Sequence, residues 1–216
     1  MMLEHRTISL AEQVFDRLET YILSGKYAPG EVLTELKLVA DLGVSRTPIR
    51  EALRRLEQEH IIEISPRGIV VIGVSKKDLK DILEIRIRIE GLAAYEAAKN
   101  ITDEQLEELR ETVELQEFYV PKHDADRING MDSKFHQMIY RFSGSTALFD
   151  ALMPLHKKVL KYRKASVENE VRSAYSSQEH RAIFEAIAAH DAPLAEQRMR
   201  DHIANAKAYI EEREGV

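Results

Sequence analysis

The stretch GVSRTPIREALRRLE, residues 43–57, decides how the first part of the chain is interpreted. Gly43 tolerates the left-handed turn that follows a helix, and Ser45 is a residue type favoured at a helix N-cap. Pro48 then falls in the first turn of the new helix, where its missing N–H costs little. The stretch therefore predicts the end of one helix, a glycine turn and a second helix that carries four arginines.

The neighbouring segments extend this pattern into a small domain. The spacing of apolar residues predicts a helix over 10–23, and Thr34 can cap a short helix that ends at Gly43. Two β-branched runs, 61–64 and 69–72, flank a Ser-Pro-Arg-Gly turn and predict a hairpin. Three helices followed by a hairpin are the arrangement of a winged helix-turn-helix domain.

From Ser75 onward the sequence predicts helices only, in the lengths typical of a bundle. Ser75 and Asp78 form a capping-box start. The segment 83–89 alternates apolar and charged residues as a strand would, but the alanine-rich segment 91–98 that continues it favours helix. We place the helices at about 76–99, 103–120, 125–142, 147–165, 173–190 and 192–213. The expected fold is mainly α, with an N-terminal winged helix-turn-helix domain and a C-terminal all-α helical bundle.

Composition limits the class of protein. The chain has 216 residues, 44% of them hydrophobic, and no apolar run approaches the ~20 residues that a membrane span needs. It contains no cysteine, which excludes disulfides and thiolate zinc fingers. Residues 1–10 lack the layout of a secretory signal, so we expect a cytoplasmic protein with no membrane partner. Because the formal net charge is −6, any binding to an anion must depend on a local basic cluster.

The arginines of residues 43–57 form such a cluster. On a helix that begins at Ser45, Arg46, Arg50 and Arg54 share one face, opposite an apolar stripe. A helix N-terminus attracts phosphate, and arginine can bond to phosphate or to a guanine edge. The alternative is a solvated face whose arginines pair with nearby glutamates, but the preceding helix and the hairpin favour DNA binding. The residues expected to contact DNA are Ser45, Arg46, Thr47, Arg50, Arg67 and Gly68.

Several of these residues belong to a longer motif. Residues 42–53, LGVSRTPIREAL, together with residues 29–31 and the wing glycine Gly68, resemble the DNA-binding domain of the GntR family of bacterial transcription regulators. The resemblance covers residues 7–74. Many members carry an arginine where this chain has Leu36. The resemblance places Gly68 at the tip of the wing, close to the DNA, and it implies operator contacts by Ser45, Arg46, Thr47 and Arg50.

Four polar residues of the bundle are expected to point inward. Asp132 and His136 project from one helix face, and His180 and His202 fall on the apolar stripes of two later helices. One divalent cation would satisfy all four groups. This set of nitrogen and oxygen ligands suits zinc, nickel or another first-row metal. The alternatives are ordinary core histidines or a metal-free hydrogen-bonded core. The remaining histidines are interpreted as surface residues: His5, His60, His123, His156 and His190.

The same positions carry a second resemblance. The segments 132–136, 179–183 and 199–203 are similar to those of the FCD ligand domain of the FadR-type GntR subfamily, over residues 78–212. Many such domains bind a metal through one aspartate and three histidines. The resemblance therefore implies a metal site made by Asp132, His136, His180 and His202.

Arg86 is the candidate effector residue. It shares a stripe with apolar residues of the helix 76–99, and a buried guanidinium needs an anion. Glu90, one turn later on the same helix, is the simplest partner. In FCD domains the matching arginine faces the ligand cavity, which implies a small carboxylate effector held between Arg86 and the metal.

Together these expectations describe a ligand-responsive transcription regulator, a repressor in our interpretation, that binds a palindromic operator as a homodimer and is not an enzyme. The competing hypothesis is a metal-dependent hydrolase with a DNA-binding appendage, since three histidines and a carboxylate also serve hydrolases. The sequence contains no HExxH motif and no GxSxG elbow that would supply a base or a nucleophile.

Overall fold

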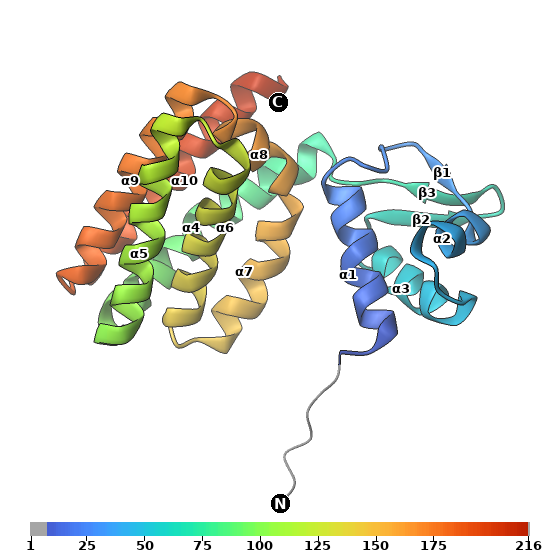
Figure 1. Ribbon diagram of the computed structural model, residues 1–216, viewed down its shortest axis with the longest axis horizontal. Helices are drawn as coiled ribbons and strands as arrows, with labels where there is room; N and C mark the ends of the chain where they lie inside the picture. Colours follow the sequence, from blue (N-terminus) through green and yellow to red (C-terminus); the bar gives the residue numbers. More distant parts are fainter. Residues whose placement is uncertain (1–7, 216) are drawn as a thin grey trace, which may run out of the picture. The chain divides into compact units, whose positions relative to one another are not determined.

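The computed structural model describes residues 8–215 (Figure 1). The chain folds into two compact units, an N-terminal unit that ends at Ser75 and a C-terminal unit that begins at Lys76. Residue 7, where the first domain is expected to begin, and His5 lie outside the described residues. The elements of the N-terminal unit are α1 (Leu10–Leu23), β1 (Val32–Leu33), α2 (Glu35–Leu42), α3 (Arg46–Gln58), β2 (Ile62–Ser65) and β3 (Gly68–Val71).

The N-terminal unit has the helix-turn-helix expected from its sequence. Gly43 ends α2 with a φ of 67°, and Ser45 takes the N-cap position of α3, although its hydroxyl makes no capping bond within residues 8–215. α3 packs along α1 and buries Ile49, Leu53 and Leu56. The buried stripe faces the core, so the arginines of α3 lie on the remaining faces.

The sheet contains one strand more than the predicted hairpin. β2 and β3 form that antiparallel hairpin, with Ser65 opposite Gly68 and the turn at Pro66 and Arg67. β1 pairs with the other edge of β3, which gives the strand order β1-β3-β2. Because β1 is two residues long, it leaves no alternating pattern that sequence analysis could detect.

Within residues 76–215 the C-terminal unit contains helices and no strand. They are α4 (Lys76–Asn100), α5 (Asp103–Tyr119), the short 3-10 helix η1 (Val120–Lys122), α6 (Ala125–Phe142), α7 (Thr146–Lys158), α8 (Leu160–Val167), α9 (Glu170–Ala188) and α10 (Ala192–Glu214). α4 buries Leu83 and leaves Ile85 43% exposed, so the helix predicted over 83–89 is confirmed. Among the described residues, no helix is both long and apolar enough to cross a membrane.

The helix predicted over 147–165 is wrong in its extent. The chain forms α7 and α8 instead, which are separated at Val159, where φ is −97° and ψ is 5°. α8 packs against α6, and its buried Arg163 bonds to Asp132 there. α9 also begins earlier than predicted, because Asn169 supplies an N-cap and accepts a hydrogen bond from the amide of Arg172 at 2.9 Å.

The bundle is built around an apolar core that ends at a buried polar cluster. α4 lies along α10, and α5 packs against both α6 and α9 (Figure 1). The small side chains of Ala93, Ala94 and Ala97 let neighbouring helices approach α4 closely. The core continues through Phe135 of α6 and Ile183 of α9. Directly beside this core lie the histidines of α6, α9 and α10.

Candidate functional site

The N-terminal end of α3 presents the residues that were expected to contact DNA. Ser45, Arg46, Thr47 and Arg50 are all exposed. The Nε atom of Arg50 donates to Oε1 of Glu35, at the start of α2, at 2.8 Å. This exposed ion pair adds little stability, but it orients the guanidinium at the open end of the helix-turn-helix.

The other two arginines of α3 differ from each other in their surroundings. Arg54 is exposed. Arg55 donates to Glu12 of α1 at 2.7 Å and lies over the ring of Phe15 at 3.8 Å. Its partner is therefore on another helix, and not one of the glutamates of α3 that the sequence suggested. Arg55 holds α3 against α1 and contributes to the fold of the N-terminal unit.

The hairpin turn exposes Arg67 and requires glycine at the next position. Gly68 has a φ of 124°, a backbone conformation that residues with a side chain rarely adopt. A Cβ atom at this position would lie 2.9 Å from the carbonyl oxygen of Leu33 and 2.9 Å from Cγ1 of Val32. The amide of Arg67 donates to Oγ of Ser65 at 3.2 Å. Gly68 thus has a structural role against β1 that sequence reasoning did not assign.

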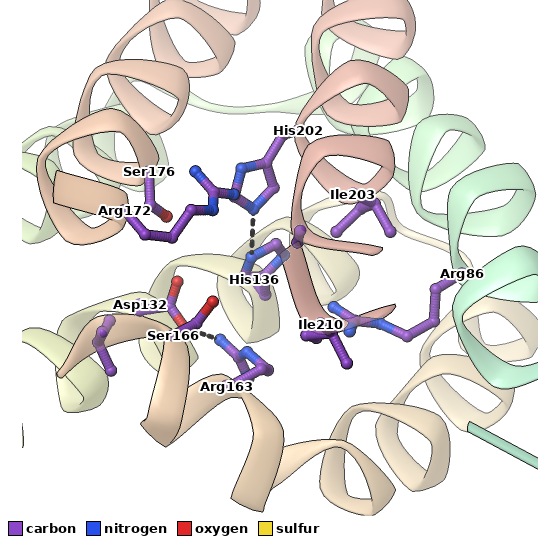
Figure 2. A pocket seen from close by; sticks show the side chains of 12 residues that line it. Arg86, Asp132, His136, Arg163, Ser166, Arg172, Ser176, His202, Ile203 and Ile210 are labelled. Atoms are coloured by element: carbon purple, nitrogen blue, oxygen red, sulfur yellow. Dashed lines mark hydrogen bonds and ion pairs between the residues drawn. The ribbon is translucent and has the colours of Figure 1, made fainter. Parts of the chain in front are cut away.

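His136, His180 and His202 converge in the buried core of the C-terminal unit. The Nε2 atom of His202 lies 3.2 Å from Nε2 of His180 and 3.3 Å from Nε2 of His136. Figure 2 shows the imidazole rings of His136 and His202 facing each other from α6 and α10. The expected convergence of inward-pointing histidines is therefore present.

Each of these rings is oriented by a hydrogen bond from its other nitrogen. The Nδ1 atoms donate from His136 to Glu90 at 2.8 Å, from His180 to Gln116 at 2.7 Å and from His202 to Glu179 at 2.7 Å. With Nδ1 protonated, a neutral imidazole carries its lone pair on Nε2, so three lone pairs face one another. Sequence reasoning missed all three partners, because they lie on distant turns of other helices.

Asp132, the fourth expected metal ligand, lies beside the three histidines. Its Oδ1 atom is 3.6 Å from Nε2 of His180, and its Oδ2 atom accepts a hydrogen bond from Arg163. Arg163 also donates to the ring of His156. The Nδ1 atom of that ring lies 3.3 Å from the hydroxyl of Tyr140. The prediction that His156 is a surface residue is wrong, because α7 turns this side chain inward against α6.

Arg86 is buried, and the partner expected within its own helix is present. Its Nε atom lies 2.5 Å from Oε1 of Glu90, and the second oxygen of that carboxylate accepts from His136. Arg86 also lines a pocket together with His136 and His202 (Figure 2). The charged and imidazole side chains around this pocket are Arg86, Asp132, His136, Arg163, Arg172 and His202.

Burial favours the neutral form of His136 and His180. It lowers the pKa of His180 to about 3, and together with the charge of Arg163 it lowers the pKa of His136 well below its usual value. Burial raises the pKa of Glu179, but the hydrogen bond from His202, the charge of Arg172 and the hydrogen bond from Asn205 act against it, and the pKa is lowered to about 2. Neutral imidazoles and ionised carboxylates are the forms that bind a divalent metal.

Both units of the chain match known families. Residues 10–72 match the bacterial regulatory proteins of the gntR family, and residues 81–205 match the FCD domain. This chain belongs to the GntR family. GntR proteins with an FCD domain are transcription regulators and not enzymes, so the hydrolase hypothesis receives no support from the matches.

Named relatives of this GntR regulator agree with that assignment. It is 30% identical over 192 residues to the HTH-type transcriptional regulator YdhC of Bacillus subtilis, with 88% of this chain and 86% of that protein covered. It is 35% identical over 133 residues to the gluconate operon transcriptional repressor of Bacillus licheniformis, with 62% and 55% covered. Among solved structures, McbR/YncC of E. coli has a TM-score of 0.83 at 26% identity and covers 96% of this chain and 99% of its own.

Proposed function

We propose that this GntR regulator is a repressor that binds a palindromic operator as a homodimer and responds to a small carboxylate. In this proposal residues 7–74 form the DNA-binding domain, and residues 78–212 form the domain that holds the effector and a divalent metal. Effector binding changes operator affinity only through a difference in its affinity for the two arrangements of the DNA-binding domains.

The DNA-binding part of the proposal is supported by what α3 and the wing expose. Arg46 and Arg50 lie in the first two turns of α3, and Arg67 lies at the hairpin turn. In a homodimer, two such recognition helices would enter major grooves about one helical turn, ~34 Å, apart and read a two-fold operator. Arginine can donate two hydrogen bonds to a guanine edge, which gives sequence discrimination.

The metal part rests on one observation: three Nε2 atoms face one another while each Nδ1 atom donates to a partner. Two nitrogens bound at ~2.05 Å to a tetrahedral ion lie about 3.3 Å apart. The distances of 3.2 and 3.3 Å from His202 to its two neighbours fit that value. Donor partners on the distal nitrogens are also usual for metal-binding histidines.

The residues that would hold the ion are His136, His180 and His202, with Oδ1 of Asp132 at the edge of the cluster. A set of three nitrogens and one oxygen suits zinc or nickel. A bound ion would supply positive charge for a carboxylate of the effector, and Arg86 lines the same pocket. The competing interpretation, a metal-free core, has to place a proton on at least one of the Nε2 atoms that face one another, and burial opposes the charged form of His136 and His180.

Operator binding by arginine variants tests the proposed function. A binding sequence is selected from random DNA with the parent protein, and its affinity is measured by fluorescence anisotropy at fixed salt. Arg46→Ala and Arg50→Ala should each weaken binding about tenfold or more, as expected for a lost bidentate base contact. Arg54→Ala, an exposed arginine further along the same helix, is the matched control and should bind like the parent. If Arg46→Ala and Arg50→Ala bind the operator as tightly as the parent does, Arg46 and Arg50 do not contact DNA.

A further inference from the structure

Three arginines line the pocket beside the histidines: Arg86, Arg163 and Arg172. In Figure 2 they approach the pocket from different helices, with Arg86 and Arg172 on opposite sides of His136. Among the described residues, each pairs with one carboxylate: Arg86 with Glu90 at 2.5 Å, Arg163 with Asp132, and Arg172 with Glu179 at 2.9 Å. The positive and negative charges of these pairs therefore balance before any ligand binds.

This balance changes when a divalent ion is held by the histidines. Neutral imidazoles add no charge, so the site would gain two positive charges that no described residue of the pocket lining offsets. An uncompensated charge in a buried site is costly. A ligand with one carboxylate would offset half of the excess, and a ligand with two carboxylates would offset all of it.

One side of the pocket also contains buried hydrogen-bond donors that lack an acceptor among the described residues. Arg172 donates to Glu179 from Nη1, while its Nε is buried and has no hydrogen-bond partner among the described residues. The same holds, within that part of the chain, for the hydroxyl of Ser166. Both residues line the pocket, on α9 and α8. Because a donor buried without an acceptor is unfavourable, this side is suited to a second anionic group.

We infer that the effector of this pocket is a small dicarboxylate, with one carboxylate directed to the histidines and the other to Arg172 and Ser166. The inference rests on the proposed metal and carboxylate site and specifies its ligand. It makes Arg172 a specificity-determining residue that recognises the second carboxylate. Replacing Arg172 leaves Glu179 with its hydrogen bonds from His202 and Asn205, so the histidine cluster keeps its orientation.

Isothermal titration of the full-length, zinc-loaded protein with matched acids tests this inference. Succinate is compared with butyrate, malate with 2-hydroxybutyrate, and gluconate serves as a monocarboxylate rich in hydroxyl groups. Each dicarboxylate should bind at least about tenfold more tightly than its monocarboxylate partner, as expected for a hydrogen-bonded ion pair in a buried site. Arg172→Gln should weaken the binding of succinate at least about tenfold more than the binding of butyrate, and so remove that difference. Arg181→Gln, which alters an arginine of the same helix that pairs with Glu117, is the matched control and should keep the difference.

The outcomes separate this inference from the proposed function. Equal affinity within each pair, or tighter binding of gluconate than of every dicarboxylate, would overturn the dicarboxylate inference and leave the carboxylate site intact. Equal weakening of both acids by Arg172→Gln would show a structural role for Arg172 and would also overturn it. If protein that has taken up zinc binds none of these acids, both the inference and the proposed effector site are wrong. Operator binding is measured separately and does not depend on this result.

Discussion

The Nδ1 atom of His136 lies 2.8 Å from Oε2 of Glu90, and both side chains are buried. This bond sets the tautomer of the ring and directs its Nε2 lone pair toward the other histidines. Substitution of such a partner usually costs 10- to 100-fold, or roughly 1.4–2.7 kcal/mol, in metal affinity. We therefore predict that Glu90→Gln weakens zinc binding by about that factor, measured by competition with a chelating dye.

The matched control for this substitution lies on the same helix. Glu84 is partly exposed and pairs with Arg88 at 2.8 Å and with Lys207 at 3.0 Å. Glu84→Gln removes a carboxylate of α4 that does not contact the histidines, and it should leave zinc affinity unchanged. If Glu90→Gln binds zinc as tightly as Glu84→Gln does, Glu90 does not orient a metal ligand.

The buried histidines predict how stability depends on pH in the metal-free protein. The pKa of His180 is about 3 in the folded chain, and that of His136 is also lowered. The unfolded chain, with histidine pKa values near ~6.5, binds more protons below that pH. The free energy of unfolding should fall as pH drops from ~6.5 toward 3, by up to about 1.4 kcal/mol per pH unit for each histidine.

Urea unfolding of chelator-treated protein at pH 7, 6 and 5 measures this dependence. His180→Asn removes one of the buried histidines with a lowered pKa and should reduce the loss of stability between pH 7 and pH 5. A variant that loses as much stability as the parent over this interval would show that His180 is not held neutral in the folded chain.

At the hairpin turn, we expect one residue, Gly68, to affect stability and its neighbour, Arg67, to affect DNA binding. A side chain at this φ of 124° would also meet the backbone of Leu33, so Gly68→Ala should destabilise the protein by about 1–3 kcal/mol. Arg67→Ala, in the same turn, should leave stability unchanged and weaken operator binding. Urea unfolding and anisotropy on both variants check this. Equal stability of Gly68→Ala and the parent would contradict the close packing of β1 against the turn.

The sequence was sufficient to predict the features that depend on local pattern. The glycine turn at Gly43, the cap position of Ser45 and the apolar stripe of α3 all follow from neighbouring residues. The helical periodicity of α6 placed Asp132 and His136 inward, and both are buried. These predictions succeeded because a helix presents residues three and four positions apart on one face.

Features that depend on distant contacts were missed. Glu90 bonds to a histidine 46 positions away, which no spacing within α4 could reveal. His156 does not align with the inward-facing stripes of the sequence, and its burial depends on contacts with Tyr140 of α6 and Arg163 of α8. The charge balance of the pocket also depends on the pairs Arg163–Asp132 and Arg172–Glu179, which the sequence analysis did not identify.

The metal content of the purified protein tests the central claim most directly. Protein prepared without chelator is analysed by inductively coupled plasma mass spectrometry, beside a double variant with His136→Ala and His180→Ala. His60→Asn is the control, because His60 is exposed and has a φ of 59°, which asparagine tolerates. We predict about one divalent ion per chain in the parent and in His60→Asn, as expected for a single three-histidine site, and almost none in the double variant. A parent without metal, or a double variant with as much metal as the parent, would contradict this prediction.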